Sequence, residues 1–390
     1  MSGSLQEKHG KYYVVFSFKD RDGNRKTEWV NTGIPAERGN KRKAEQRMVE
    51  IISEREARLE MMAGTKDMPF ADYIDLWLEQ VKDTVDIITY DGYKSYIVNH
   101  IKPYFAKLDL ALHNVKVTDI EKYFDSKAKS GRLDGKKGGL SHRSLELHKS
   151  VLSHMFTDAM RDPYNLKMNP CRFAKISKEA VKSPKHISFY TTEQCKGLLE
   201  ITAKTPLYDM IYITFMYGLR RSELMGLKWS AIDFDKGTLS ICHTVVVGEK
   251  GVVSKDSTKN RSSHRTYPIL DDIKPILIRL KNEQEKNKEF FNGSYNDSGY
   301  VFTREDGKPY YPSYPYNELT KILKKFSLPH IRWHDLRHSC ATMLLDKGWC
   351  MKDISDWLGH ADIGTTMDIY AHLDIDHKRK MANELIGTLV

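Results

Sequence analysis

The sequence has few cysteines, and their spacing excludes the usual cysteine-based scaffolds. No two of them form a C-x-x-C pair and their number is odd, which argues against a disulfide framework and a structural zinc site. No apolar run approaches the roughly 18 residues of a membrane-spanning helix, and the opening MSGSLQEKHG lacks the apolar core of a signal peptide. We therefore expect a cytoplasmic protein with no membrane partner. The five cysteines are Cys171, Cys195, Cys242, Cys340 and Cys350.

Acidic residues are in short supply relative to basic ones. The 390 residues include 62 Lys and Arg against 52 Asp and Glu, which gives a formal net charge of +10. The excess is uneven, because residues 131–187 alone hold 12 basic and 5 acidic residues. Such a surface favours a polyanionic partner, most often a nucleic acid, although a basic surface that only aids solubility would have the same composition.

The chain is too long for one hydrophobic core, and its composition divides it into three predicted domains. In residues 1–65, KYYVVFSFKD, the turn RDGNRK and TEWVNTGI predict a β-hairpin, with a third short strand before or after it. The stretch NKRKAEQRMVEIISEREARLE then predicts a helix whose apolar stripe is Met48, Ile51 and Ile52. This small sheet and helix form either a structural appendage or a module that lies in a DNA groove.

Residues 66–180 predict a domain made only of helices. FADYIDLWLEQV has helical spacing, and LSHRSLELHKSVLSHMFTDAM predicts a long helix capped by Ser141. Opposite its apolar stripe this helix carries Arg143, Lys149 and several histidines, a face that either contacts a DNA backbone or is simply solvated. The stretch from Phe173 to Ile187 lacks apolar periodicity and predicts a linker.

Residues 181–390 predict a mainly helical domain with one strand pair, formed by GTLSICHTVVV and RTYPIL. The fold class expected for the chain is therefore mainly α with small β parts. In YGLRRSELMGLKW, Gly218 is predicted to end a helix and Arg220 to begin the next, with Glu223 one turn further on. This guanidinium can bind an oxyanion while the carboxylate orients it, although Arg-x-x-Glu pairs on helices are usually surface ion pairs.

The polar stretch KDSTKNRSSHRTYPI is predicted to form a basic hairpin tip. Its residues around Lys259 leave the strands, and the chain returns at Arg265. Taken alone, this stretch more often indicates a simple solvated turn.

The segment WHDLRHS places His334 and His338 four residues apart on a predicted helix, a spacing found in H-E-x-x-H zinc proteases. A zinc site would need a third ligand, for which only His360 is a candidate, and would have to tolerate Arg337 between the histidines. We therefore expect no metal. Read as His-x-x-Arg, the segment places one imidazole and one guanidinium where both can hold one phosphate. With Leu336 on the buried face, we expect the two histidines and the arginine on the opposite side.

The last motif is WLGHADIGTTMDIYAHL. Gly359 is predicted to end a helix, His360 follows it, and Tyr370 comes ten residues later on the next helix. An isolated tyrosine is far more often a core or surface residue than a nucleophile, but arginines, histidines and a lysine in the same domain favour the catalytic interpretation.

Together, GLRRSELMGLKW, TKNRSSHRTYPI, HDLRHSCATMLL and LGHADIGTTMDIYAH resemble the four active-site motifs of the tyrosine recombinases, in the same order. The resemblance covers residues 188–373. The layout of the two preceding domains is similar to the arm-binding and core-binding domains of phage and conjugative-transposon integrases. Asn260 stands where the family usually has Thr, so Lys255 remains an alternative to Lys259. The resemblance implies a catalytic set of Tyr370, Arg220, Lys259, His334, Arg337 and His360, supported by Glu223.

Phosphodiester chemistry explains why these residue types are needed. The anionic phosphate resists attack, so Arg220 and Arg337 would neutralise its oxygens as charge builds up in the transition state. A tyrosine hydroxyl has a pKa of about 10, so His334 would help to remove its proton, with His360 completing the shell. A general acid must protonate the leaving 5′-oxygen, a role that suits the lysine. The family resemblance implies a 3′-phosphotyrosine link, which needs no ATP, metal or other cofactor for religation.

The function expected from the sequence is site-specific recombination of a phage or other mobile element. The expected partners are double-stranded DNA with core and arm sites, three further copies of the chain in a tetramer, and excisionase or DNA-bending accessory proteins. The alternatives are a type IB topoisomerase, a non-catalytic DNA-binding protein and, for HDLRH alone, a zinc hydrolase.

Overall fold

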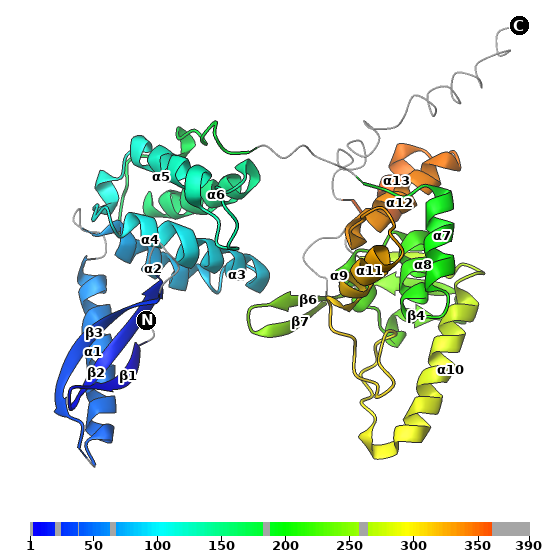
Figure 1. The fold of residues 1–390 in the computed structure, drawn as a ribbon, viewed down its shortest axis with the longest axis horizontal. Coiled ribbons are helices and arrows are strands. Elements are labelled where there is room, and N and C mark those ends of the chain that lie inside the picture. The colour runs from blue at the N-terminus through cyan, green and yellow to red at the C-terminus, as the bar shows by residue number, and fades with distance from the viewer. Residues whose placement is uncertain are drawn as a thin grey trace, which may run out of the picture. The chain divides into compact units, whose positions relative to one another are not determined.

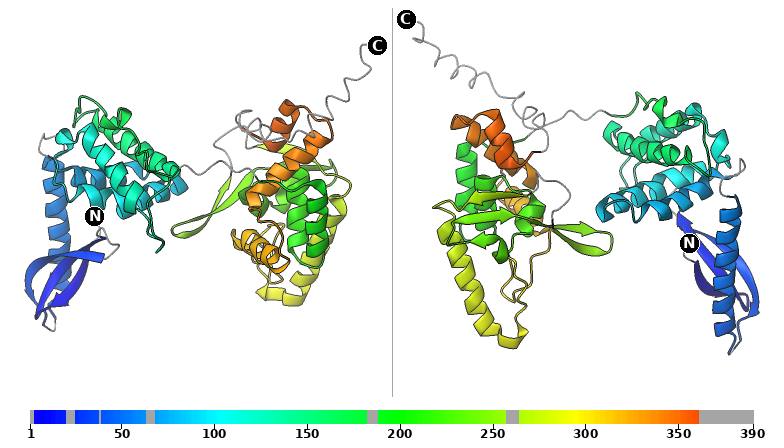
Figure 2. Two further views of the ribbon diagram at one scale, coloured as in Figure 1. Left: turned by 45° about the horizontal axis from the view of Figure 1, so that its top comes forward. Right: turned by 180° about the vertical axis from the view of Figure 1, so that it is seen from behind.

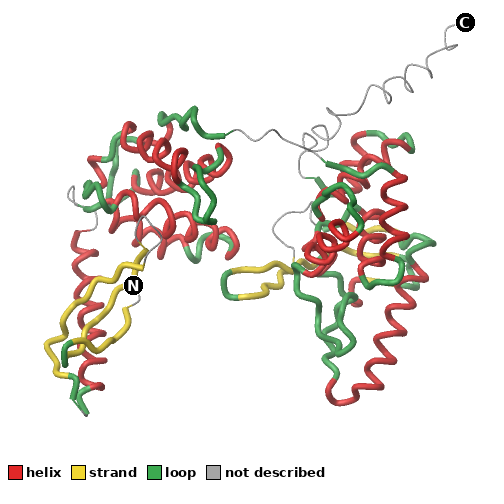
Figure 3. Tube along the Cα trace, viewed as in Figure 1, coloured by secondary structure: helices red, strands yellow, loops and turns green. Residues whose placement is uncertain are grey.

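The computed structural model describes residues 3–19, 25–37, 39–62, 68–181, 188–256 and 264–360. The chain divides into two compact units, residues 1–184 and 185–390 (Figure 1). Both contain helices and small antiparallel sheets, and helix dominates, so the predicted fold class is confirmed (Figure 3). The domain boundary expected near residue 65 stays a prediction. Among the described helices, none is both long and apolar enough to cross a membrane.

The first unit begins with a three-stranded antiparallel sheet in the order β1-β2-β3. The predicted hairpin is confirmed, and the third strand lies before it. The sheet packs on α1, as the predicted stripe requires: Ile51 is buried with Val14 and Phe16, while Met48 and Ile52 are partly buried. The elements are β1 (Gly3–Lys8), β2 (Lys11–Lys19), β3 (Arg25–Pro35) and α1 (Lys41–Met62).

The rest of the first unit is helical, as predicted. Ser141 caps the long helix α6 by accepting a hydrogen bond from the backbone N–H of Ser144 at 3.2 Å. One π-helical turn, Ile97–Ile101, joins α3 to α4. The helices are α2 (Phe70–Val81), α3 (Ile87–Tyr96), α4 (Lys102–Phe105), α5 (Val117–Ser130) and α6 (His142–Ala159), with 3-10 turns at Leu112–Asn114 and Pro170–Arg172.

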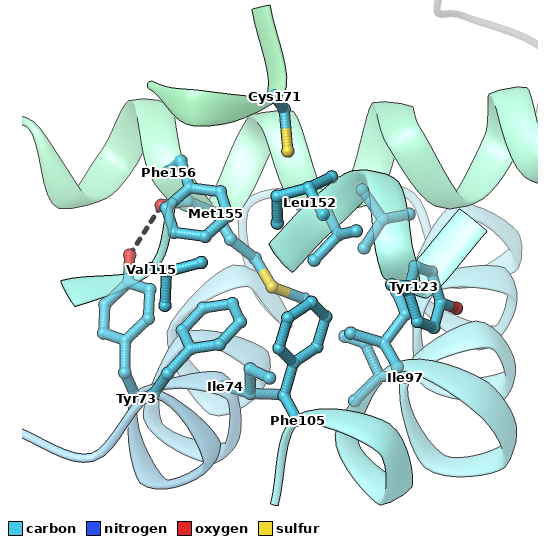
Figure 4. Packing of buried hydrophobic residues seen from close by; sticks show 14 of the residues in the cluster. Tyr73, Ile74, Ile97, Phe105, Val115, Tyr123, Leu152, Met155, Phe156 and Cys171 are labelled. Carbon is cyan, nitrogen blue, oxygen red and sulfur yellow. Dashed lines mark hydrogen bonds between the residues drawn. The ribbon is translucent and has the colours of Figure 1, made fainter. Parts of the chain in front are cut away.

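Aromatic side chains fill the core between these helices (Figure 4). Phe70 stacks on Phe156 with ring centroids 4.9 Å apart, and the Tyr73 hydroxyl donates to the carbonyl oxygen of Met155 at 2.7 Å. His148 belongs to the interior as well, with 1% of its surface exposed. His148 is therefore not one of the several histidines expected on the polar face of α6, because its ring is enclosed by aromatic neighbours.

The segment predicted to be a linker is structured over much of its length. Ala174 and Ala180 are buried against the helical core, and Ile176 is partly buried there. The linker prediction was therefore wrong for residues 174–180, because two small alanines provide the contact and leave no apolar periodicity in the sequence. Residues 182–187 lie outside the described residues.

The second unit is built around α8, a helix with buried residues on most of its surface. It packs against α7, α11 and α12, while α13 packs on α12 (Figure 2). The helices are α7 (Thr192–Thr202), α8 (Leu207–Tyr217), α9 (Arg221–Met225), α10 (Lys274–Phe291), α11 (Tyr314–Lys325), α12 (Trp333–Asp346) and α13 (Met351–Leu358).

Two small sheets replace the single strand pair that we predicted for this unit. The pairing of GTLSI with RTYP is confirmed as β5 with β8, but HTVVV forms its own hairpin with GVVSKD. That hairpin turns at Glu249 and Lys250, and Lys255 and Asp256 still belong to its second strand. The chain returns to a strand at Arg265, as predicted, whereas residues 257–263 around Lys259 lie outside the described residues. The strands are β4 (Ile232–Asp233), β5 (Thr238–Ile241) and β8 (Arg265–Pro268), and β6 (His243–Gly248) with β7 (Gly251–Asp256).

Candidate active site

Arg220 stands at the junction of two helices and is fixed there by its neighbour Glu223. As predicted, α8 ends at Gly218 and Arg220 is the residue before α9. Glu223 accepts hydrogen bonds from the backbone N–H of Arg220 at 2.9 Å and from its Nη1 at 2.7 Å. The Nη2 of Arg220 donates to the carbonyl oxygen of Gly359 at 3.1 Å. The guanidinium is thus held in one orientation while 35% of its side chain remains exposed.

Gly218 is required by the space around it as well as by its conformation. Its φ of 61° lies in the left-handed region that favours glycine. A Cβ at this position would clash with Leu358 Cδ2 and come within 3.3 Å of Cys340 Sγ. The residue therefore allows α8, α12 and α13 to meet closely, and its carbonyl oxygen accepts a hydrogen bond from Arg337 Nη1 at 2.8 Å.

Arg337 is the most unusual side chain of the site, because a guanidinium with 0% exposure is rare. Its Nε and Nη2 have no hydrogen-bond partner within the described part of the chain. Burial, and then the charge of Arg220, lower the pKa of Arg337 to about 9, which leaves it protonated at neutral pH. A buried cation with unmatched donors is well suited to bind an oxyanion.

The structure corrects our expectation for the faces of α12. Arg337 does not lie opposite the buried side; it is itself buried, together with Leu336 and Ser339. The reason is that α12 contacts α7, α8, α11 and α13, so most of its circumference is covered. His334 is exposed and His338 is intermediate in exposure, so the histidines keep some contact with the surface.

Three histidines share the surroundings of the two arginines. The rings of His334 and His338 lie 5.1 Å apart, edge to face. Although His334 as a whole residue is exposed, its neighbours partly desolvate the ring, and this desolvation, followed by the charge of Arg337, lowers the pKa of His334. Burial and the neighbouring His334 lower the pKa of His338 to about 4, and burial and the charge of Arg337 lower that of His360 to about 3. Near pH 7 all three are neutral imidazoles, which can accept a proton.

The structure therefore brings together motifs that are as many as 139 residues apart in sequence. Gly359 ends α13 and His360 follows it, as predicted. Lys259 and Tyr370, however, lie outside the described residues. Lys255, the alternative to Lys259, lies in β7 opposite Thr244. Within the described residues, no group of three or more His, Cys, Asp or Glu side chains is arranged to hold a metal ion.

Sequence reasoning missed the contribution of β8. Arg265, 9% exposed, donates from Nη1 and Nη2 to the two carboxylate oxygens of Glu223 at 3.1 and 2.7 Å. Its Nε donates to the Tyr267 hydroxyl at 2.5 Å, and that hydroxyl donates to the carbonyl oxygen of Trp357. The available signal was the Arg-x-Tyr spacing, since alternate residues of a strand point to the same side.

The charge balance at Glu223 follows from these contacts. Burial alone would raise the pKa of Glu223, but the hydrogen bonds and charge of Arg265, with the charge of Arg220, outweigh it and lower the pKa to about 2. The carboxylate is therefore ionised at any pH at which the protein would be studied.

The two basic residues expected to contact DNA from α6 differ in their surroundings. Arg143 is at the surface, with 78% of its side chain exposed, and pairs with Glu146 at 3.1 Å. Lys149 Nζ instead donates to the carbonyl oxygen of Ala174 at 2.5 Å. In this structure Lys149 thus holds the segment after α6, whereas the guanidinium of Arg143 is accessible from solvent.

Comparison with protein families identifies matches over both units. Residues 188–377 match the family model described as "Phage integrase family". Residues 69–127 match "Phage integrase, N-terminal SAM-like domain". The first match includes every residue proposed for catalysis, and the second covers α2 to α4 and most of α5.

Individual proteins give consistent matches. The "Tyrosine recombinase XerC-like" protein of Caldanaerobacter subterraneus subsp. tengcongensis is 29% identical over 343 residues, which cover 83% of this chain and 84% of the relative. "Tyrosine recombinase XerA" of Pyrococcus furiosus is 31% identical over 248 residues, covering 62% and 74%. Among solved structures, the Tn1549 transposon integrase in complex with transposon right end DNA has a TM-score of 0.61 at 22% identity, covering 81% of this chain and 99% of that chain, which shows a shared fold.

Proposed function

Because the chain belongs to the tyrosine recombinase family, we propose that it is the integrase of a mobile genetic element, such as a phage or a conjugative transposon. The chain is a site-specific recombinase, an enzyme that breaks and rejoins DNA strands. The phage integrase model that matches residues 188–377 supports a mobile element as the source of its substrate. Family membership does not favour a type IB topoisomerase or a non-catalytic DNA-binding protein.

The observation that carries this proposal is the state of Arg337. Its guanidinium is fully buried, and two of its donor groups have no partner in the described structure. Leaving such donors unmatched costs stability, so a ligand that accepts from them explains their presence. A phosphodiester supplies the charge and the oxygens, and the neighbouring Arg220 adds a second cation that is partly exposed.

The proposed reaction starts with Tyr370 as nucleophile. Its hydroxyl oxygen attacks the phosphorus while His334, a neutral imidazole at pH 7, accepts the proton. The bond from phosphorus to the 5′-oxygen breaks, and Lys259, with Lys255 as the alternative, protonates the leaving oxygen. The DNA strand is then joined to the tyrosine through its 3′-phosphate. Attack by a new 5′-hydroxyl reverses these steps, so religation needs no ATP, metal or other cofactor.

Throughout both steps the arginines stabilise the charge on the non-bridging oxygens. The largest benefit is expected in the transition state, in which these oxygens gather negative charge. His360 completes the shell, and Glu223 orients Arg220 from behind through two hydrogen bonds.

We further infer the partners and location of the enzyme. Double-stranded DNA with core and arm sites is the proposed substrate: residues 1–65 would bind arm sites, residues 66–180 core sites, and residues 181–390 would perform catalysis. Arg143 and Lys149 would contact phosphates from α6, Lys149 after releasing Ala174. Strand exchange between two duplexes requires four active sites, which supports a homotetramer on DNA in the cytoplasm, assisted by excisionase or DNA-bending proteins.

The DNA sequence that the enzyme cleaves can be identified by experiment without being known beforehand. The full-length protein is incubated with sheared DNA from its host, covalent complexes are captured under denaturing conditions, and the attached fragments are sequenced. A nicked duplex with the recovered sequence then traps the cleaved state, because the short strand beyond the nick diffuses away.

We expect the wild-type chain to form a denaturant-stable adduct with this duplex, in the presence of EDTA as well. Tyr370→Phe deletes one oxygen and keeps the ring, so it should bind the duplex normally and form no detectable adduct. Adduct from the Tyr370→Phe protein would refute the assignment of the nucleophile and direct attention to other tyrosines such as Tyr310 and Tyr314. Loss of the wild-type adduct on adding EDTA would contradict the metal-free mechanism.

A further inference from the structure

The carboxylate of Glu223 is shared between two arginines. Both of its oxygens accept from Arg265, and both also accept from Arg220, one from the side chain and one from the backbone. The carboxylate is 3% exposed and Arg265 is 9% exposed, whereas 35% of the Arg220 side chain is exposed. The buried partner thus lies behind the acid, and the partly exposed partner lies toward solvent.

The contact between Arg265 and Glu223 affects how much positive charge Arg220 can offer to an anion. A lone carboxylate in contact with Arg220 would orient it but would also cancel much of its charge, because attraction is strong in a poorly solvated place. A second cation on the same carboxylate balances that negative charge. With Arg220, Arg265, Arg337 and Glu223 in one group, three positive charges stand against one negative charge, and two remain for an anion.

We propose that Arg265 is a positioning residue of the recombinase: it neutralises Glu223 from behind, so that Glu223 can orient Arg220 without weakening its hold on the phosphate. This inference rests on the proposed function, since the phosphate is the one to be cleaved. Arg265 itself acts through Glu223 and does not need to touch DNA.

Strand β8 extends this support to the other side of the site. The Nε of Arg265 donates to the Tyr267 hydroxyl, which donates to the carbonyl oxygen of Trp357 in α13. Two residues further on, the carbonyl oxygen of Gly359 accepts from Arg220. Arg220 is therefore braced by β8 along two routes, one through Glu223 and one through the last turn of α13.

The test compares Arg265→Gln, Arg265→Lys, Glu223→Gln and the double variant Glu223→Gln/Arg265→Gln in the full-length protein. The single-turnover rate of adduct formation and the Kd are measured on the recovered nicked duplex. We expect Arg265→Gln to slow adduct formation by about 30-fold, less than loss of a direct oxyanion donor, while the Kd changes less than about threefold. Arg265→Lys keeps the charge but cannot make two parallel hydrogen bonds to the carboxylate, so its adduct rate should lie between those of Arg265→Gln and the wild type.

The double variant separates positioning from general damage. If Arg265 acts through Glu223, then Arg265→Gln should slow the Glu223→Gln protein by no more than about threefold, because coupled residues are not additive. The matched control is Arg279→Gln, which removes an arginine from another buried acid, Asp209, at 2.6 Å in the same unit. Effects of the two substitutions that multiply, or an Arg265→Gln rate no lower than that of Arg279→Gln, would overturn the proposal.

A second probe, inorganic phosphate, does not depend on recombination. Phosphate should raise the unfolding temperature of the wild type above that in chloride of equal ionic strength, and Arg265→Gln should lose more of this rise than Arg279→Gln. An equal phosphate response in both variants would also count against the role of Arg265. A wild type that forms no adduct but shows this difference would refute the proposed function and leave the electrostatic role intact.

Discussion

Two buried polar side chains, one in each unit, differ in whether their hydrogen-bonding atoms have partners within the protein. In the first unit His148, 1% exposed, has its Nδ1 2.7 Å from the Tyr123 hydroxyl, so this buried nitrogen has a partner. In the second unit Arg337 is equally buried, but its Nε and Nη2 have none among the described residues. A group that only stabilises a fold is matched inside the fold. A group that binds a ligand keeps donors unmatched until that ligand arrives.

This difference implies that Arg337 lowers the free energy of unfolding, whereas the hydrogen bond of His148 raises it. An uncompensated buried cation destabilises the protein that carries it, and replacing it by an apolar side chain of similar size is often stabilising. A buried hydrogen bond between neutral groups contributes a modest stabilisation. Substitutions at the two places should therefore separate activity from stability.

The largest effect is expected from Arg337→Met. Without the guanidinium, the adduct rate on the nicked duplex should fall by roughly 10²–10³-fold, the range for loss of one oxyanion donor, while DNA affinity changes little. The unfolding temperature should stay equal or rise, because a buried charge has been removed. Calorimetry and a denaturing gel measure the two quantities. A less stable protein would show that the guanidinium is compensated in the fold after all.

The second prediction concerns the pH dependence of stability. Burial, and then the nearby His100, lower the pKa of His148 to about 3; burial, and then the charge of Lys127, lower that of His100 to about 4. Below pH 6.5 the unfolded chain therefore binds protons that the folded chain rejects, so stability falls as the pH falls toward 4. The buried His148 alone should cost about 1 kcal/mol of stability between pH 6.5 and 5.5.

The variant His148→Gln isolates this contribution. His338 and His360 in the second unit have lowered pKa values as well, so only the difference between variant and wild type is informative. Urea denaturation at a series of pH values should give a shallower loss of stability for His148→Gln below pH 6.5. Parallel curves for the two proteins would mean that His148 is protonated equally in the folded and unfolded states.

The third prediction concerns Tyr123→Phe, a substitution at the hydrogen-bond partner of His148. It leaves the His148 Nδ1 without its hydroxyl partner and should reduce the free energy of unfolding by about 1–2 kcal/mol. The adduct rate at a temperature where both proteins are folded should not change. Reduced cleavage by folded Tyr123→Phe protein would show that this core also takes part in the reaction.

The smallest effect is expected at the surface. Arg143→Ala removes an exposed guanidinium and should weaken binding to unrelated duplexes by similar factors. The slope of log Kd against log salt concentration should fall by about one, which corresponds to one lost phosphate contact. Fluorescence anisotropy at several salt concentrations measures the slope. Weakening confined to one DNA sequence would identify Arg143 as a base-reading residue instead.

Local signals in the sequence predicted the helix ends that position the site. Gly218 and Gly359 end their helices as expected, and Arg220 stands directly before the next helix. These helix ends are predictable because the left-handed conformation of a terminal glycine is decided locally. Family resemblance, a different kind of information, supplied the proposed roles of Lys259 and Tyr370. Their placement lies outside the described residues, so it stays a prediction.

Tertiary packing accounts for what the sequence did not predict. The burial of Arg337 depends on four helices that surround α12, and no pattern within α12 reveals them. The contacts of Arg265 with Glu223 join residues 42 positions apart. The packing of Ala174 and Ala180 rests on two small side chains that leave no periodic signal. In each case the contact joins residues that are far apart in the sequence.

The close approach at Gly218 also has a genetic consequence. Any missense change of a glycine codon introduces a residue with a Cβ, and at this position a Cβ would clash with the side chain of Leu358. The same residue supplies the carbonyl oxygen that holds Arg337. Codon 218 should therefore tolerate no amino-acid replacement in a library selected for recombination, and its survivors should carry only synonymous changes.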